Sequence, residues 1–174
     1  MATLLARARH RLAGAGRRPR VAGPPSPSVG GSETVILHRW AAAADLPKLS
    51  EKAKKLLEGK NFAFVATLNK DGTPQLTPTW VDTDGENLLV NTALGRQKAK
   101  NVKRDPRVTV GVFDIGNPYE YISVTGKVVR STTGKAADEH IDKLAMKYLG
   151  KAKYPWSSPQ EKRVIFTIRP SKSV

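Results

Sequence analysis

Apolar and polar residues alternate along several short segments of the chain, which is the pattern of half-buried β-strands. Residues 62–69 and 74–82 show it, with the turn sequence NKDG between them, and a second Asp-Gly turn leads into 88–92. Such turns typically connect neighbouring strands in a hairpin. Three strands joined so tightly predict an antiparallel meander rather than a βαβ unit.

Three more strands are expected further along the chain, at 107–115, 119–131 and 162–170. Gly126 interrupts the second of these and predicts a bulge or bend. Earlier in the chain, Pro78 lies inside segment 74–82. Because proline cannot donate to a ladder of hydrogen bonds, it indicates an edge, a bulge or a strand end there.

Helical spacing of apolar residues appears in two segments. Residues 49–57 predict a short amphipathic helix with Ser50 as its N-cap and Gly59 as its stop, and residues 137–150 predict a longer one capped by Gly150. A short basic helix is expected within 93–106. About six antiparallel strands with short helices predict an α+β, mainly antiparallel β fold, closed into a small barrel because closure removes sheet edges.

The first 45 residues differ in composition from the rest. They hold seven arginines, no lysine and only two acidic residues, and 14–32 consist mostly of Gly, Pro, Ser and Arg. Such a segment cannot offset the entropy of ordering itself, so 1–45 are predicted to be a disordered basic extension and 46–174 the folded domain. An organelle transit peptide and an untargeted extension from an upstream start codon are the two interpretations.

The chain of 174 residues carries a net charge of +15, of which the part from residue 46 onward keeps +10. Such a charge favours a polyanionic partner: nucleic acid, anionic lipid, or a phosphorylated or carboxylated small molecule. The chain has no cysteine, which excludes disulfides, thiolate metal sites and cysteine nucleophiles. Its apolar runs are too short for membrane insertion, and a cytoplasmic protein is expected.

Standard catalytic constellations are not supported by the sequence. Two of the three histidines lie in the extension, and His140 is expected on a helix surface. Asp82 and Asp84 are expected in a turn. No metal site, catalytic triad or phosphate-binding glycine loop is indicated, so no catalytic residue is assigned. If the protein is an enzyme, a bound cofactor has to carry the chemistry.

Two segments remain as candidate binding elements. The basic cluster within 96–104 can converge on one phosphate at a helix start, or can be a solvated helical face. Residues 77–80, with the sequence TPTW, can offer hydroxyls and a backbone edge to a flat ring, or can be a strand with an edge proline.

Several stretches together resemble one family: FAFVATLNKDGTPQLTPTWVD, LLVNTALGRQKAKNVKRDPRVTVGVFD, NPYEYISVTGKV and ADEHIDKLAMKYLG. They are similar to the pyridoxamine 5'-phosphate oxidase-like split β-barrel family, in its deazaflavin (F420)-dependent oxidoreductase branch. The resemblance covers residues 46–174 and is most specific in 91–107. It implies an FMN-binding-like split barrel, a homodimer with cofactor sites at the interface, and coenzyme F420 or FMN as cofactor.

The resemblance also implies positions for the cofactor. The tricyclic ring, ribityl chain and phosphate would be held by Gln75, Thr77, Pro78, Thr79, Asn91, Thr92, Arg96, Gln97, Lys98 and Asn101. Hydride transfer between the deazaflavin and an unsaturated small-molecule substrate is implied. The surplus cations Lys100, Lys103 and Arg104 would suit the polyglutamate tail of F420, whereas FMN has only its phosphate.

Several alternatives stay open at this point. A C-terminal Arg-x-Glu-Phe-Trp segment is missing, which disfavours oxidation of vitamin B6. Trp156, in the sequence YPW, can close the site from the partner subunit or can pack in the core. Tyr119, Tyr121 and solvent are all candidate proton donors. A nucleic-acid binder is disfavoured because no RNP, helix-turn-helix or zinc signature is present. A cofactor carrier without turnover is the third interpretation.

Overall fold

The computed structural model describes residues 36–37 and 48–173 of the chain. The strands in this part are β1 (Ile36–Leu37), β2 (Ala63–Leu68), β3 (Pro74–Thr79), β4 (Val81–Thr83), β5 (Leu88–Ala93), β6 (Arg107–Phe113), β7 (Tyr121–Thr133) and β8 (Arg163–Ser173). The helices are α1 (Glu51–Glu58), α2 (Gln97–Arg104) and α3 (Lys135–Leu149). Apart from β1 and the separate strand β4, their order along the chain agrees with the order expected from the sequence.

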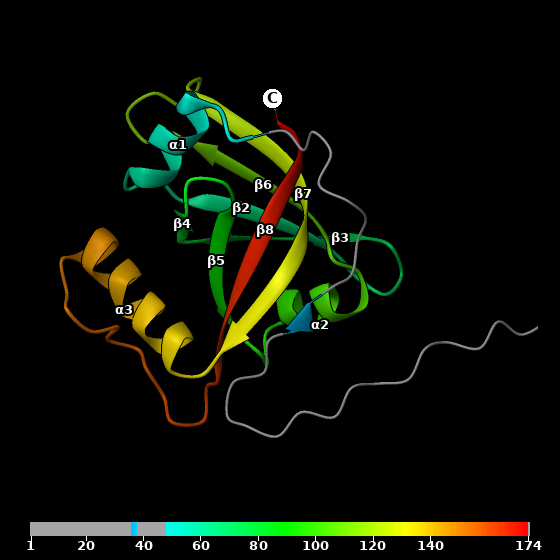
Figure 1. Cartoon of the computed structure of the whole chain (residues 1–174), viewed down its shortest axis with the longest axis vertical. Helices are drawn as coiled ribbons and strands as arrows, with labels where there is room; N and C mark the ends of the chain where they lie inside the picture. Colours follow the sequence, from blue (N-terminus) through cyan, green and yellow to red (C-terminus); the bar gives the residue numbers. More distant parts are fainter. Residues whose placement is uncertain (1–35, 38–47, 174) are drawn as a thin grey trace, which may run out of the picture. The chain divides into compact units, whose positions relative to one another are not determined.

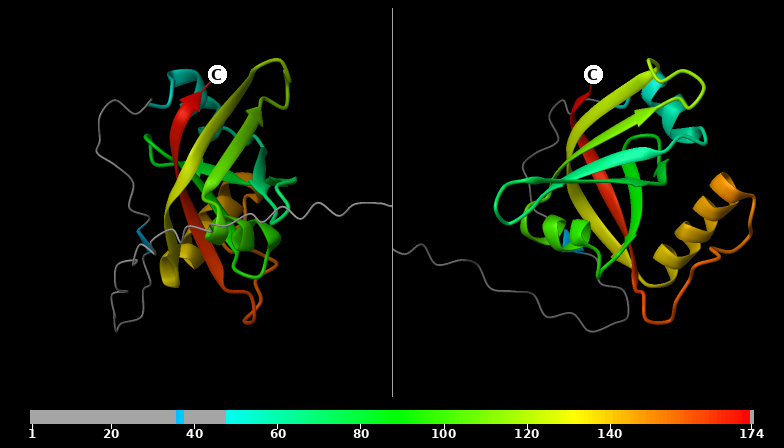
Figure 2. Two further views of the ribbon diagram at one scale, coloured as in Figure 1. Left: turned by 90° about the vertical axis from the view of Figure 1, so that its right-hand side faces the viewer. Right: turned by 180° about the vertical axis from the view of Figure 1, so that it is seen from behind.

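All the strands form one antiparallel sheet in the order β3-β2-β6-β7-β8-β5-β4, with β1 paired to β7. The strands at the two ends of this path, β3 and β4, are consecutive in the chain and are separated only by Trp80. The sheet therefore has to curl until its ends approach each other, and Figures 1 and 2 show the strands wrapped around a common interior. The predicted antiparallel α+β barrel is confirmed.

The interior of the barrel is filled by alternate residues of the strands. In β6 the side chains of Val108, Val110 and Val112 are buried, and in β7 those of Ile122 and Val124 lie opposite them. Each buried aliphatic side chain contributes about 1.5–3 kcal/mol relative to an exposed one. The period of two that predicted these strands is thus the period with which they line the core.

Local signals in the sequence explain two further features of the fold. The Ser50 hydroxyl accepts a hydrogen bond from the amide of Ala53 at 3.2 Å and caps α1, as predicted. The register of β7 against β8 shifts at Gly126, which confirms the predicted bulge. A side chain at Gly126 would collide with the carbonyl oxygen of Arg169, so the bulge needs glycine.

The region around Pro78 differs from the prediction in detail. Pro78 lies inside β3, which pairs only with β2 in the described sheet, so the predicted edge position is confirmed. The chain breaks into two strands at Trp80, not at the proline. Asp82, expected in a turn, therefore lies in β4. This split gives one strand more than the six that alternation predicted.

A second difference concerns the N-terminal extension. Ile36 and Leu37 pair with Ser131 and Arg130 of β7 and belong to the sheet, which composition did not indicate. The other residues of the predicted disordered extension, 1–35 and 38–45, lie outside the described residues.

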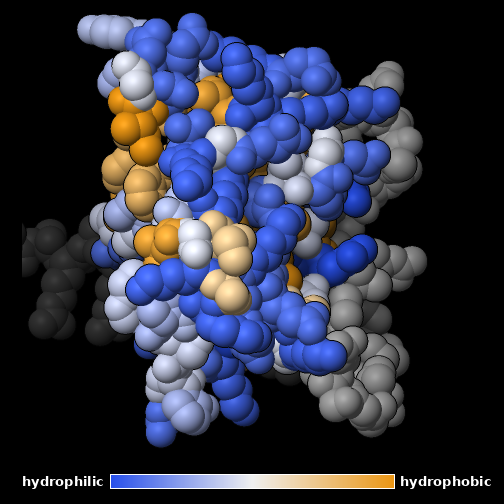
Figure 3. Space-filling model, turned by 90° about the vertical axis from the view of Figure 1, so that its left-hand side faces the viewer, coloured by the Kyte–Doolittle hydropathy of each residue, from blue (hydrophilic) through white to orange (hydrophobic). Residues whose placement is uncertain are grey.

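Helix α3 is fixed at its C-terminal end by hydrogen bonds to distant backbone groups. The Tyr148 hydroxyl accepts from the amide of Val81 at 3.1 Å and donates to the carbonyl of Asn61 at 2.7 Å. The Lys147 ammonium donates to the carbonyls of Val81 and Leu57. Figure 3 shows the side of the molecule on which α1 and α3 lie, and most of this surface is hydrophilic. The anchored helix forms one wall of the cavity described below.

Candidate functional site

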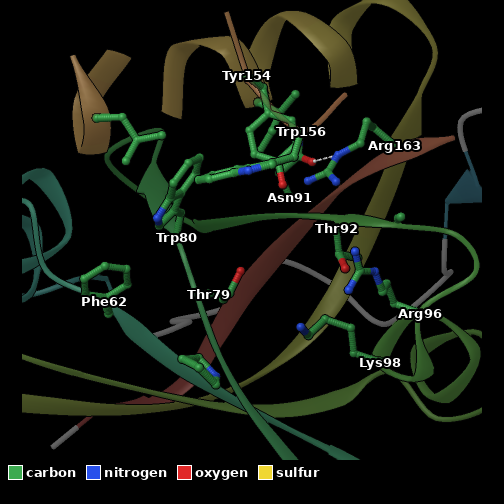
Figure 4. A pocket seen from close by; sticks show the side chains of 14 residues that line it. Phe62, Thr79, Trp80, Asn91, Thr92, Arg96, Lys98, Tyr154, Trp156 and Arg163 are labelled. Atoms are coloured by element: carbon green, nitrogen blue, oxygen red, sulfur yellow. Dashed lines mark hydrogen bonds between the residues drawn. The ribbon is translucent and has the colours of Figure 1, made fainter. Parts of the chain in front are cut away.

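A cavity of about 490 Å³ is bounded by α3, the segment that follows it, the start of α2, and strands β3, β5 and β8 (Figure 4). Six of the residues expected to bind a cofactor line it, namely Pro78, Thr79, Asn91, Thr92, Arg96 and Lys98. The two segments that the sequence singled out, 77–80 and 96–104, thus meet at one cavity although they come from different parts of the chain.

Three cationic side chains line this cavity. Arg96 and Lys98 lie at one end, and Arg163 lies between them and the aromatic rings, with its guanidinium 5.1 Å from the centre of the Tyr154 ring. Lys98 is only 9% exposed, and its ammonium has no hydrogen-bond or ion-pair partner within the described part of the chain. Burial, followed by the charges of Arg96 and Arg163, lowers the pKa of Lys98. A largely buried lysine without a carboxylate partner is unfavourable, so this end favours an anionic ligand.

One carboxylate holds two of these cations in place. Glu161 accepts from Arg96 at 2.9 Å through one oxygen and from Arg163 at 3.1 Å through the other. The hydrogen bond from Arg96 keeps the pKa of Glu161 below its usual range, so the carboxylate stays charged at neutral pH. It offsets one of the three positive charges, and the cationic end remains positive.

The start of α2 adds to this positive character. Arg96 occupies the N-cap position without a side-chain capping bond, and no acidic residue lies in the first turn. The free amides and the dipole of a helix start are therefore not balanced locally. Together with Lys98, this arrangement suits a phosphate better than a neutral group.

Aromatic rings form the opposite end of the cavity. Trp80 stacks on Tyr148 with ring centroids 5.1 Å apart and an angle of 4° between the rings. Tyr154 meets Trp80 edge-on at 5.8 Å, and Trp156 lies 6.4 Å from Trp80. Figure 4 shows the rings of Trp80, Tyr154 and Trp156 grouped together, with Phe62 on the adjoining wall. Such a wall fits a flat hydrophobic ring system.

Asn91 connects the strands to α3 at the wall between these two ends. It is 4% exposed, and its Oδ1 accepts from Arg163 Nε at 2.9 Å. Its Nδ2 donates to the carbonyl of Ala137 at 2.8 Å. Asn91 was expected beside the cofactor, and the structure shows that it also orients Arg163.

Gln97 and Asn101 do not line the cavity. Asn101 is fully buried and donates to Thr67 Oγ1 and to Asn69 Oδ1, each at 3.0 Å, while it accepts from Gln97 at 2.9 Å. These bonds fasten α2 to β2 and to the hairpin that follows it. In this structure the two residues position the helix that carries Lys98, and their contact with a cofactor stays a prediction.

Gln75 and Thr77 lie on β3 but do not line the cavity. Gln75 accepts a hydrogen bond from Thr67 at 3.0 Å. The hydroxyl of Thr77 is buried and has no hydrogen-bond partner among the described residues. An unpaired buried hydroxyl next to Pro78 and Thr79 is compatible with a polar ligand group near this strand.

A family model described as pyridoxamine 5'-phosphate oxidase matches residues 49–173. The chain belongs to this family. A solved structure named F420 reductase is 32% identical, with a TM-score of 0.61, and the match covers 70% of this chain and 94% of that one. The family membership agrees with the resemblance derived from the sequence.

Two further solved structures share the fold. A conserved hypothetical protein from Mycobacterium tuberculosis is 22% identical, with a TM-score of 0.55 and coverage of 77% of this chain and 88% of that one. A protein of unknown function from Agrobacterium tumefaciens is 19% identical, with a TM-score of 0.53 and coverage of 72% and 56%. The pyridoxamine 5'-phosphate oxidase fold therefore extends to proteins of low sequence similarity.

His140 and Asp82 are placed differently from what the sequence suggested. The side chains of both are only 9% exposed, and His140 Nε2 lies 3.4 Å from Asp82 Oδ2. Lys143 donates to the same oxygen at 2.6 Å. The expectation of a surface histidine was wrong because α3 turns this residue toward β4 and β5.

Sequence reasoning missed several residues of the cavity. Arg163 and Tyr154 were not proposed. Trp80 was part of the candidate segment 77–80 but not of the expected cofactor contacts, and Trp156 was left open between a site residue and a core residue. Trp156 is 62% exposed and lines the cavity of its own chain. The cluster of aromatic residues in YPW was a usable signal. Arg163 had none, because its partner Asn91 is distant in sequence.

Two candidates for a proton donor lie elsewhere. Tyr119 and Tyr121 are both exposed and are not among the residues that line this cavity.

Within the described residues, no helix is long and apolar enough to cross a membrane.

Proposed function

We propose that this protein is an oxidoreductase that uses coenzyme F420, or alternatively FMN, to exchange a hydride with an unsaturated small-molecule substrate. The observation that carries the proposal is the largely buried Lys98, which has no anionic partner among the described residues and lies with Arg96 at one end of a cavity whose other end is aromatic. Both cofactors combine a phosphate with a flat tricyclic ring, which matches these two ends.

The residues present fit such a cofactor in charge and in shape. Arg96, Lys98 and the amides at the start of α2 would hold the phosphate. Thr79, Asn91 and Thr92 would lie along the ring and the ribityl chain, as the resemblance implied. Gln75, Thr77, Pro78, Gln97 and Asn101 complete the proposed set, the last two through the position of α2.

When bound and reduced, the cofactor supplies a hydride, with two electrons, to an unsaturated carbon of the substrate, and a proton from solvent completes the reduction. The protein's own side chains bind and orient the two reactants. The rings of Trp80, Tyr154 and Trp156 limit access of water to the apolar end. No tyrosine is assigned as an acid, because Tyr119 and Tyr121 do not line the cavity.

The choice of F420 over FMN is supported by the outer side of α2. Lys100 and Lys103 are exposed, and no hydrogen bond or ion pair joins either to another described residue. Their charges suit the carboxylates of a polyglutamate tail, which FMN lacks. The 32% identity to a structure named F420 reductase supports the same choice.

A homodimer is part of the proposal. Residues directly opposite one another in antiparallel strands share a face, and the register of β2 with β3 puts Phe64, Leu76 and Pro78 on the outside of the barrel. Leu76 is 60% exposed, and Phe64 stacks on Phe113 of β6 on this side. An exposed apolar face of this kind favours a second copy of the chain. Because Pro78 also lines the cavity, the second copy would lie next to the site.

The oligomeric state is tested by light scattering on the intact protein and on a Leu76→Arg variant. We expect the intact protein to be a dimer and the variant to be a folded monomer, because a charge would be buried in the contact. A monomeric intact protein would contradict the proposed dimer.

The cofactor is tested by titrating the protein with F420 and with FMN while following tryptophan fluorescence. Two of the three tryptophans, Trp80 and Trp156, line the cavity, so binding should change the signal. We expect micromolar or tighter binding of F420 and weaker binding of FMN. Tighter binding of FMN would transfer the proposal to a flavin-dependent oxidase or reductase, and binding of neither would refute it.

The variant Lys100→Ala/Lys103→Ala provides a control that separates the two cofactors. It should weaken the binding of F420 and leave FMN unaffected. Turnover is then measured as oxidation of reduced F420 in the presence of a quinone or an enone. Binding without turnover of either acceptor would instead indicate a cofactor carrier.

A further inference from the structure

A series of buried polar groups leads from the cavity, past β5, to the contact between β4 and α3. Arg163 donates to Asn91 Oδ1, Asn91 Nδ2 lies 3.3 Å from His140 Nδ1, and His140 Nε2 lies 3.4 Å from Asp82 Oδ2. Arg163 and Asn91 line the cavity, whereas His140 and Asp82 do not. This series of polar groups therefore connects the imidazole of His140, which lies outside the cavity, to the guanidinium of Arg163, which lies inside it.

The orientation of the Asn91 amide is fixed by two neighbours that can each play only one role. The guanidinium of Arg163 can only donate, so the Asn91 atom at 2.9 Å from its Nε has to be the oxygen. The carbonyl of Ala137 can only accept, so the atom 2.8 Å from it has to be the nitrogen. Neither assignment depends on the imidazole.

The fixed amide determines which nitrogen of His140 carries the proton. The second hydrogen of Asn91 Nδ2 faces His140 Nδ1, which accepts it only when that ring nitrogen is unprotonated. The neutral ring then carries its proton on Nε2, on the side of the Asp82 carboxylate. In the neutral state Nδ1 thus faces a donor, and Nε2 carries its hydrogen next to the carboxylate, 3.4 Å away, although no hydrogen bond is formed at that distance in this structure.

We propose that His140 is a positioning residue whose neutral Nε2–H tautomer holds Asn91 against Arg163, and that its protonation weakens the binding of anions in the cavity. In the doubly protonated ring Nδ1 also donates, and it would face the donor Nδ2 of Asn91. The amide can relieve this only by rotating. Rotation would turn Nδ2 toward Arg163, so Arg163 would lose its acceptor and its position.

The charged groups around His140 come from three elements. Asp82 lies on β4, Lys143 on α3, and Arg163, behind Asn91, on β8. Lys143 lies 2.6 Å from Asp82 and partly neutralises it. The expected effect on ligand binding rests on the proposed function, in which the cavity holds a phosphate-bearing cofactor. The expected tautomer of His140 is independent of that function.

The tautomer is tested by nitrogen-15 NMR of the imidazole rings in the ligand-free protein at pH 8. The chain has three histidines, so His140→Gln assigns the signal of His140 by its disappearance. We expect a neutral ring with hydrogen on Nε2 and none on Nδ1. A ring with hydrogen on Nδ1, alone or together with Nε2, would overturn the proposal without any bearing on the cofactor.

The effect on the cavity is tested by titrating FMN between pH 8 and pH 5 into the full chain and into two variants. When a ligand binds only after one group has lost its proton, lowering the pH raises the dissociation constant by at most about tenfold for each pH unit. In His140→Gln a neutral amide can accept from Asn91 and donate to Asp82 at every pH. We expect this variant to bind FMN as the unchanged chain does at pH 8 and severalfold more tightly at pH 5.

The control is His38→Gln, which removes a histidine outside the described residues and should keep the pH dependence of the unchanged chain. The phosphate of FMN titrates in the same range, but its contribution is identical in all three proteins. Equal pH profiles for His140→Gln and the unchanged chain would overturn the proposal. If FMN and F420 fail to bind at every pH, the proposed function fails, while the NMR result still decides the role of His140.

Discussion

The two ends of the cavity differ in how far the chain satisfies its own side chains. At the aromatic end, Trp80 stacks on Tyr148 and meets Tyr154 edge-on, so each ring has partners within the protein. At the cationic end, Lys98 has no partner in the described part of the chain, and Glu161 offsets only one of three positive charges. The first end is complete without a ligand, and the second is not.

This difference separates stability from binding. Rings that pack on one another stabilise the fold whether or not a ligand is present. Buried like charges cost stability in the ligand-free protein and repay that cost only when an anion binds. Substitutions at the two ends should therefore have opposite effects on the free energy of unfolding. Experiments on both ends can test this difference.

The largest effect is expected from the double substitution Arg96→Ala/Lys98→Ala. Each residue can form charge-assisted hydrogen bonds to a phosphate, worth about 1.5–3 kcal/mol apiece. We expect the affinity for F420 and for FMN to fall by about 3–5 kcal/mol, or more than about a hundredfold. Fluorescence titration measures the loss.

The matched control carries the same change in charge on the exposed side of α2. Lys100→Ala/Lys103→Ala should leave the affinity for FMN nearly unchanged, because these exposed side chains do not line the cavity. Equal losses of FMN affinity in both double variants would mean that overall charge, and not the cationic end, determines binding.

The next effect concerns the aromatic end. Trp80→Ala removes the ring that Tyr148, Tyr154 and Trp156 all contact. Because Trp80 is half-buried, we expect the free energy of unfolding to fall by about 2–4 kcal/mol, toward the lower end of the range for removing a large core ring. Urea denaturation of the ligand-free protein measures it. An unchanged midpoint would show that the rings do not stabilise the fold.

A smaller effect is expected from Asp82→Asn. Asp82 does not line the cavity and supports it through His140 and Asn91. Burial alone would raise the pKa of Asp82, but the neighbouring His140 and the hydrogen bond from Lys143 outweigh burial and hold the pKa well below its usual range. The stabilisation is therefore complete above the unfolded value of 3.8 and is lost as the pH falls through the lower folded value.

We therefore expect Asp82→Asn to destabilise the protein by about 1–3 kcal/mol at neutral pH, and the difference from the unchanged chain to shrink below about pH 4. Thermal unfolding as a function of pH measures both. A difference that stays constant down to the lowest pH at which the protein folds would contradict the assigned role of the carboxylate.

The smallest effect has the opposite sign. Lys98→Met removes a buried ammonium whose pKa is lowered by burial and by Arg96 and Arg163. We expect the ligand-free protein to gain about 0.5–2 kcal/mol. The folded pKa lies below the unfolded value of 10.5, so stability of the unchanged chain should rise with pH in the window just below that value, and this rise should be absent in the variant. A destabilised variant would contradict the claim that the cationic end costs stability in the ligand-free protein.

The fold could be read from the sequence because its signals are local. Ser50 and Gly150 mark the ends of helices through their own backbone and side-chain geometry, and Gly126 marks a bulge. Alternation with a period of two gave the strands. The break at Trp80 and the strand β1 had no such local signal, since both depend on which strands lie next to each other.

The site was only partly readable, for the same reason. Arg96 and Lys98 were visible as a dense basic cluster, and their position in the cavity agrees with that interpretation. Arg163 and His140 became meaningful only through Asn91, which lies far from both in the sequence. Asn101 was taken for a ligand contact, yet a fully buried amide in a hydrogen-bonded network has the same sequence signature.

The most direct test of the account is to compare each cofactor with its dephosphorylated counterpart. FMN and riboflavin, and F420 and the corresponding phosphate-free deazaflavin, are titrated into the same protein at moderate salt. If the cationic end binds the phosphate while the aromatic end takes the ring, each phosphorylated compound should bind at least about a hundredfold more tightly than its counterpart. Equal affinities within each pair would contradict a phosphate site at Arg96 and Lys98.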